Sequence, residues 1–96
     1  MWGLSGGGTG VHGQSGTGRG GVFESERIAQ VRLVPTVIPA LPALGELGDL
    51  FLLVSTDPTT GETAPTLYLC VSPGDGTPGN AAQWAPVQLG PAEVGG

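Results

Sequence analysis

The stretch WGLSGGGTGVHGQSGTGRGGVFES, residues 2–25, contains an internal repeat. Its unit reads x-Gly-x-Ser-Gly-x-Gly-x-Gly-Val and recurs at a spacing of ten to eleven residues. If Gly21 is counted as a one-residue insertion, Val11 aligns with Val22, and Trp2, His12 and Phe23 occupy equivalent places. A fixed repeat period indicates a repetitive architecture, so this stretch decides the fold assignment.

The glycines of the repeat restrict how residues 1–21 can fold. Glycine costs about 1 kcal/mol per position in a helix, which argues against helix here. In extended chain, a glycine marks a place where another backbone comes close. The repeat therefore predicts an intertwined β stalk, in which several chains pack around one axis. The expected contacts between chains in this stalk are Trp2, Val11, His12, Val22 and Phe23.

The composition predicts a chain that needs partners to fold stably. Its 96 residues include 19 glycines and 9 prolines, which contribute little to a core, and only 11% of the residues are charged. One cysteine and one histidine exclude an internal disulfide and a zinc cluster. Small folds without such cross-links commonly rely on oligomerisation. We therefore expect an obligate oligomer.

The charge excludes two classes of partner. The formal net charge is −5, with three arginines and no lysine, whereas nucleic acids and anionic membranes require a basic surface. No apolar run approaches the length of a membrane span, and residues 1–21 lack the basic and apolar segments of a secretion signal. We expect no nucleic-acid partner and no membrane insertion.

The residues after the repeat divide into four parts. Residues 22–34, VFESERIAQVRLV, alternate with a period of two, which favours a strand, with a short helix over residues 24–30 as the alternative. They complete the predicted stalk, residues 1–34. Three prolines in residues 35–44 predict an extended linker. Residues 45–90 form the predicted β-domain, and residues 91–96 a flexible tail.

The β-domain is predicted to be a three-stranded antiparallel meander. Its strands are expected at residues 49–56, 66–72 and 83–89, and the segments between them are rich in glycine and proline. The first strand is apolar on both faces. One face is therefore left to be covered by another subunit or by the first half of the chain, and Leu50 and Leu52 are expected at that interface. The complete fold is expected to be all-β.

Two glycine-rich segments resemble nucleotide-binding loops without meeting their requirements. Residues 8–13 fit G-x-G-x-x-G, but no strand precedes them and no helix follows. Residues 13–20 approach a P-loop, yet Arg19 replaces its lysine and Gly20 its serine or threonine. His12 and Ser15 could be members of a catalytic triad. We prefer the interpretation that the His12 ring packs at an interface between subunits. We predict no cofactor site.

The acidic residues are interpreted as surface and turn residues. Glu24 and Glu26 are expected on a solvent face, paired with Arg27 or Arg32. Other carboxylates, such as Asp57 and Asp75, lie in turns that hold too few ligands for calcium. We therefore predict no catalytic residue and no metal site.

Three residues of the β-domain could have either a structural or a functional role. Cys70 lies inside an apolar run, so we expect a buried structural thiol in preference to a reactive one. Tyr68 and Trp84 are expected to cap the core of the meander, and an exposed sugar-binding platform is the alternative.

The repeat GTGVHGQSGTGRGGVFES, residues 8–25, resembles the GVxGxS-type glycine repeats of bacteriophage tail and head fibres and related bacterial surface fibres. The series GDLFLLV, TLYLCV and Trp84-Ala-Pro-Val resembles the meander that often follows such stalks. The resemblance implies a non-enzymatic homotrimer on a virion surface or outside the cell, with other virion or fibre proteins as partners. A tip that binds a cell-surface glycan or receptor, and a self-assembling filament subunit, are the alternatives. With barely two repeats, the chain is expected to be a short capsid-mounted member or an excerpt of a longer fibre.

Overall fold

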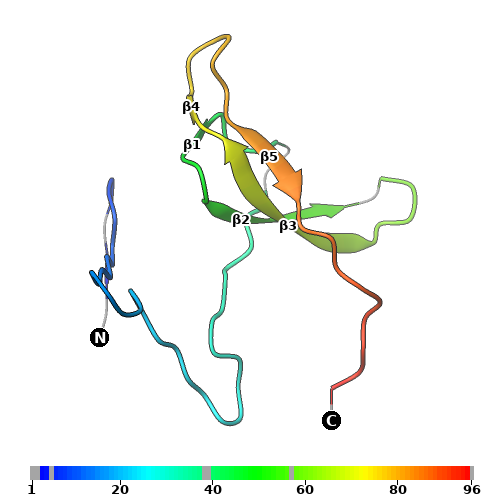
Figure 1. Ribbon diagram of the computed structural model, residues 1–96. Coiled ribbons are helices and arrows are strands. Elements are labelled where there is room, and N and C mark those ends of the chain that lie inside the picture. Colours follow the sequence, from blue (N-terminus) through cyan, green and yellow to red (C-terminus); the bar gives the residue numbers. More distant parts are fainter. Residues whose placement is uncertain (1–2, 5, 38–39, 57, 96) are drawn as a thin grey trace. The chain divides into compact units, whose positions relative to one another are not determined.

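The computed structural model describes residues 3–4, 6–37, 40–56 and 58–95, in two compact units, Met1–Arg32 and Leu33–Gly96 (Figure 1). Throughout these residues there is no helix, and the fold is all-β, as predicted. The regular strands all belong to the second unit. Trp2, a predicted contact between chains, and Asp57 lie outside the described residues.

The second unit contains two small antiparallel sheets. The larger has the order β2-β3-β5, and the smaller pairs β1 with β4. Figure 1 shows the β1–β4 pair at one end of the larger sheet. The strands are β1 (Leu44–Gly45), β2 (Leu50–Thr56), β3 (Thr63–Ser72), β4 (Gly74–Asp75) and β5 (Gln83–Pro86).

The larger sheet matches the predicted three-stranded arrangement. Both of its pairings are antiparallel, with Phe51 opposite Tyr68 and Cys70 opposite Trp84. The turn between β2 and β3 ends with Gly61 at φ 74°, a backbone conformation that glycine adopts without strain. The strand β3 begins three residues earlier than predicted, and β5 ends at Pro86, where a proline is tolerated on an edge strand.

The β1–β4 pair was not predicted, because each strand has only two residues and no hydrophobic period. Leu44 lies opposite Asp75, and Gly45 lies opposite Gly74. The backbone N–H of Ala82 donates a 2.8 Å hydrogen bond to the carbonyl oxygen of Ala43, which ties the same segment to the approach of β5. Residues 42–45 are thus held across one face of the larger sheet.

That covered face contains the small core of the unit. Cys70 is only 1% exposed, which confirms the prediction of a buried thiol, and its S–H group donates to the carbonyl oxygen of Ser72. The ring of Trp84 lies 5.9 Å from that of Phe51, centroid to centroid. A Cβ added to Gly45 would lie 2.8 Å from Cζ2 of Trp84, so only glycine fits between β1 and the indole.

Part of the proline-rich segment joins the sheet. The N–H of Thr36 donates to the carbonyl oxygen of Leu52, and the N–H of Val54 donates to the carbonyl oxygen of Thr36, both at 3.0 Å. These two bonds form an isolated parallel bridge between Thr36 and Leu53 at the outer edge of β2. Because the unit boundary follows Arg32, the described residues of 35–44 lie in the second unit.

The prediction of a strand over residues 22–34 is wrong, and the alternative helix is absent as well. Residues 26–28 and 30 form bends instead. The side chains of Ile28 and Val31, which lie on opposite parities of the predicted strand, are both exposed. The sequence does alternate between apolar and polar residues here. In the described part of the chain, however, no neighbouring strand pairs with this segment, and a lone strand lacks the hydrogen bonds between strands that would stabilise it.

The turn between β4 and β5 supplies a prediction about pH. Oδ1 of Asp75 accepts hydrogen bonds from the N–H and the hydroxyl of Thr77. These bonds, chiefly the one from the Thr77 side chain, hold the pKa of Asp75 below its ordinary value of 3.8. Because the folded-state pKa is lowered, the carboxylate stabilises the fold above pH 3.8, and this contribution is lost as the pH falls through the folded-state pKa.

We expect Asp75→Asn to remove this pH dependence while keeping an oxygen that accepts both bonds. The melting temperature of the wild-type chain should exceed that of the variant at pH 6, and the difference should shrink between pH 4 and pH 2.5. Circular dichroism melts of the two chains over this range measure it. A constant difference across the range would contradict the assignment.

Candidate functional site

The first unit has a ten-residue structural period. Bends occur at residues 6–8, 16–18 and 26–28, each followed by a further bend at residues 10, 20 and 30. Two of these turns are closed in the same way. The N–H of Gly18 donates to Oγ of Ser15 at 2.8 Å, and the N–H of Ile28 donates to Oγ of Ser25 at 3.3 Å. Such local side-chain bonds are the reason that serine favours turns.

This period corrects the alignment of the repeats. The bends continue through residues 22–31 without an insertion, so Gly21 is equivalent to Val11, and Val22 is equivalent to His12. Phe23 consequently takes the place of Gly13, not that of His12. The predicted insertion rested on matching the two valines, whereas the serine-closed turns fix the register independently of the apolar residues.

Two pairs of glycines hold the repeats tightly folded. A Cβ added to Gly13 would collide with the carbonyl oxygen of Gly20, and one added to Gly3 would collide with Val11 and with Gly10. Both pairs are seven residues apart and ten residues from each other. They were not among the predicted site residues, although glycines spaced seven apart in both repeats were visible in the sequence. Close approach of two backbone segments therefore occurs inside one chain.

The third repeat lacks this pair of glycines. Phe23 and Gln30 replace the two glycines at the positions equivalent to Gly13 and Gly20. In the second repeat the two positions are not equally crowded: a Cβ added to Gly13 would collide with the carbonyl oxygen of Gly20, whereas one added to Gly20 would lie 3.1 Å from the carbonyl oxygen of Gly13. The paired glycines thus do not continue beyond Gly20, although the bends do.

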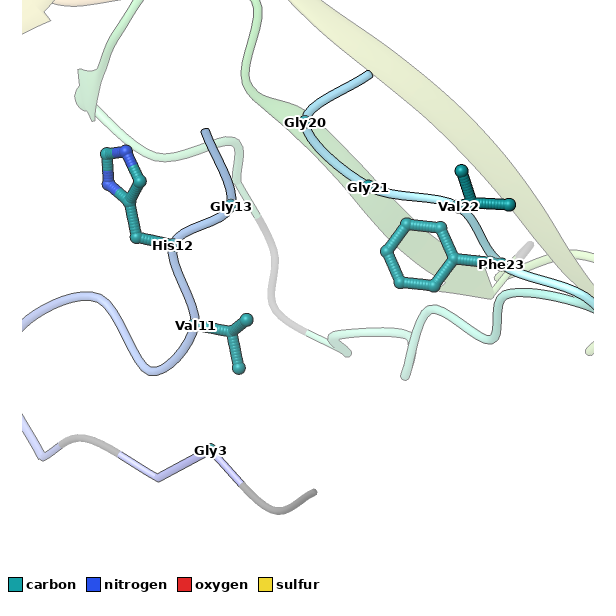
Figure 2. Close-up of a pocket in the computed structure, with 8 residues that line it drawn as sticks. All are labelled: Gly3, Val11, His12, Gly13, Gly20, Gly21, Val22 and Phe23. Carbon is teal, nitrogen blue, oxygen red and sulfur yellow. The ribbon is translucent and has the colours of Figure 1, made fainter. Parts of the chain in front are cut away.

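An open groove of about 840 Å³ lies within the first unit (Figure 2). Glycine backbone forms much of its wall, and Figure 2 shows the Val11 side chain and the Phe23 ring pointing into the space between their segments. The side chains of Val11, Val22 and Phe23 are 61%, 74% and 68% exposed. The lining residues are Gly3, Val11, His12, Gly13, Gly20, Gly21, Val22 and Phe23.

The groove brings together four of the five residues predicted at the stalk interface. Val11, His12, Val22 and Phe23 all line it, and the fifth lies outside the described residues. Its apolar side chains and glycine backbone offer a surface for packing. Oγ of Ser15, which could be drawn beside His12 in a triad, accepts the Gly18 N–H at 2.8 Å in the local turn.

The predicted acidic surface is only partly as expected. Glu24 and Glu26 are exposed, as predicted. However, no ion pair joins either residue to Arg27 or Arg32 in the part of the chain that the structure describes, so the predicted pairing is wrong. All these side chains are exposed. An ion pair between exposed side chains gains little free energy relative to separate hydration of the two charges.

Tyr68 and Trp84, the candidate ligand platform, lie on the covered face of the larger sheet. Tyr68 is opposite Pro86, and Trp84 is opposite Cys70, so the two aromatic residues are diagonal neighbours. Both are half-buried. The indole N–H of Trp84 donates a 2.9 Å hydrogen bond to the carbonyl oxygen of Pro42, and this bond occupies its polar group within the chain. These contacts favour a packing role for Trp84.

Leu50 and Leu52, predicted at a subunit interface, lie on the other face of the sheet. Leu50 is opposite Leu69 and exposed, and Leu52 is opposite Leu67 and half-buried.

Within the described ranges, no group of three or more His, Cys, Asp or Glu side chains could hold a metal ion. The same residues contain no helix with the length and apolar character that crossing a membrane requires. The chain matches no protein-family model, no curated protein and no solved structure.

Proposed function

We propose that this chain is a non-enzymatic structural protein, a fibre or decoration module of a virion that assembles as a homotrimer. The glycine repeat serves as its intertwined stalk, and the β-domain is a terminal or joining module. The observation that carries this proposal is the groove of the first unit, in which exposed Val11, Val22 and Phe23 side chains lie beside glycine backbone.

The groove favours assembly because a single chain leaves it empty. Apolar side chains in water gain roughly 25 cal/mol for each Å² that becomes buried, so a second chain that fills the groove is stabilising. The glycine walls allow that chain to approach closely without meeting side chains. Three-fold packing follows the resemblance of residues 8–25 to fibre repeats, and a virion surface or extracellular location follows from the same resemblance.

The shortage of core in the rest of the chain supports the same proposal. Among the hydrophobic residues that the structure describes, Cys70 alone is buried. A monomer with so little burial must offset the conformational entropy of 96 residues by few contacts. Partner chains supply the missing contacts. Other virion or fibre proteins would add further contacts at the ends of the trimer.

The mass of the assembled protein tests the proposal. Native mass spectrometry of the full chain is expected to give three times the chain mass of 9.5 kDa. The trimer should dissociate in a single transition together with the loss of its β circular dichroism signal. A folded monomer that stays monomeric at high concentration would refute the proposal. Open polymers in electron micrographs would indicate that the chain forms a filament and not a trimer.

A further inference from the structure

The basic residues of this chain all precede residue 33. They are Arg19, Arg27 and Arg32, and the chain has no lysine. Residues 1–32 carry a formal charge of +1, from three arginines and two glutamates, whereas residues 33–96 carry −6, from six acidic residues and no arginine. A protease that cuts after basic residues therefore finds its sites in the first unit alone and has none in the second.

Arg32 lies in a stretch of exposed, irregular chain. Residues 26–35 are all exposed, and residues 31–35 contain neither a bend nor a strand. Among the residues that the structure describes, none of the hydrogen bonds involves residues 29–35. Burial and backbone hydrogen bonding decide where a folded chain can be cut, because a protease must reach the backbone on both sides of the bond. The Arg32–Leu33 bond meets this condition without local unfolding.

Arg27 is also exposed, but its peptide bond belongs to a closed turn. The N–H of Ile28, which is the nitrogen of that bond, donates to Oγ of Ser25 at 3.3 Å. In addition, Glu26 directly precedes Arg27. Proteases of the trypsin type select arginine with an acidic pocket, and such a pocket repels a carboxylate beside the bound arginine. Arg32 has no such neighbour, since residues 27–45 contain no acidic residue.

Arg19 lies in the most tightly folded part of the repeat. The N–H of the preceding residue, Gly18, donates to Oγ of Ser15 at 2.8 Å. The carbonyl oxygen of the following residue, Gly20, lies against the backbone of Gly13, where an added Cβ would collide with it. A protease would have to open both contacts to reach the Arg19–Gly20 bond.

We propose that the Arg32–Leu33 peptide bond is a processing site for a trypsin-like serine protease. Hydrolysis breaks the C–N bond of this peptide and consumes one water, which leaves a carboxylate on Arg32 and an ammonium group on Leu33. The first product, residues 1–32, contains the groove of the repeat, and the second, residues 33–96, contains the five strands of the described residues. The bridge at Thr36 also lies in the second product, so the cut breaks none of the described hydrogen bonds of the sheets.

The cleavage site is separate from the groove on which the proposed assembly depends. The residues that line the groove end at Phe23, whereas the exposed stretch begins at residue 26. The inference therefore goes beyond the proposed function, and it holds whether the chain is a trimer or a monomer. In a fibre module, the cut ends the covalent link between the stalk and the β-domain.

Limited digestion of the full chain with trypsin tests the inference. Intact-mass spectrometry of samples taken over time is expected to show the first cut after Arg32, with two products that together exceed the chain mass by one water. The cut after Arg27 should be about fivefold slower, because the turn must first lose a hydrogen bond of ordinary net strength. Anion exchange should retain residues 33–96 and not residues 1–32. A first cut after Arg19 or Arg27, or a folded chain that resists trypsin while the heat-unfolded chain is cut, would overturn the inference.

Matched variants separate the effect of the fold from the preference of the protease. Arg32→Gln should abolish the early products, whereas Arg27→Gln should leave them unchanged. Ser25→Ala removes the hydroxyl that closes the turn, so the rate of cleavage after Arg27 should rise about fivefold while the rate after Arg32 stays the same. If Ser25→Ala changes both rates equally, or changes neither, the folded turn does not direct the protease to Arg32, and the assignment is wrong.

Discussion

Gly13→Ala is expected to break the proposed homotrimer, whereas Gly16→Ala in the same repeat is expected to preserve it. The Cβ of an alanine at residue 13 would collide with the carbonyl oxygen of Gly20. The obstacle is backbone, so no side-chain rotation relieves it. Overpacking of this kind costs about 1–3 kcal/mol in each chain, which amounts to about 3–9 kcal/mol in a trimer.

Gly16→Ala is a close control because no atom lies within 4 Å of its added Cβ. Its backbone φ is also outside the positive range that penalises a side chain, so alanine there should be neutral or slightly stabilising. Light scattering gives the mass of both variants, and circular dichroism melts give their stability. An unchanged trimer in Gly13→Ala would contradict the role of the glycine pair. A loss in both variants would instead indicate that another chain approaches Gly16.

Trp84→Ala is expected to unfold the second unit. The substitution removes the ring that packs on Phe51 and Gly45, and it removes the hydrogen bond to the carbonyl oxygen of Pro42. Truncation of a large aromatic residue in a core costs about 3–5 kcal/mol, and the half-buried position of Trp84 places this case near 3 kcal/mol. Because so few other residues of this unit are buried, we expect its free energy of unfolding to be too small to tolerate this loss.

Trp84→Phe separates the ring from its N–H group. Phenylalanine keeps an aromatic side chain beside Gly45 but cannot donate to Pro42, so we expect a loss of about 1 kcal/mol. Thermal melts and a glycan-binding assay should be run on both variants. If Trp84→Ala keeps the melting temperature of the wild type and loses only glycan binding, the packing role is wrong, and Tyr68 with Trp84 forms a ligand platform.

The strands of the larger sheet were predictable because each carries its own local signals. The apolar runs around Phe51 and Tyr68 are bounded by segments rich in glycine and proline, and Gly61 takes the positive φ that its turn requires. The burial of Cys70 followed from its place in such a run. By contrast, β1 and β4 depend on contacts far apart in the sequence, and no local pattern marks a two-residue strand.

Four of the residues expected at the stalk interface line one groove, but the register of the repeats was predicted wrongly. The valines suggested an insertion at Gly21, whereas the serine-closed turns keep a strict ten-residue period. The strand expected over residues 22–34 failed for a related reason. Apolar alternation describes which side chains share a face, but a strand also needs a partner for its backbone groups, and a sequence pattern does not supply one.

By itself, the sequence showed a glycine repeat with apolar residues at fixed places, and the structure showed which glycines cannot carry a side chain. Glycines seven residues apart allow two backbone segments to meet, and the apolar residues beside them remain available for another chain. Only the tertiary structure decided which face of the larger sheet is covered. That choice depends on Gly45 and Pro42 meeting Trp84 across the sheet, and it leaves Leu50 and Leu69 exposed on the other side. Both faces are apolar in sequence, so the strand pattern alone cannot distinguish them.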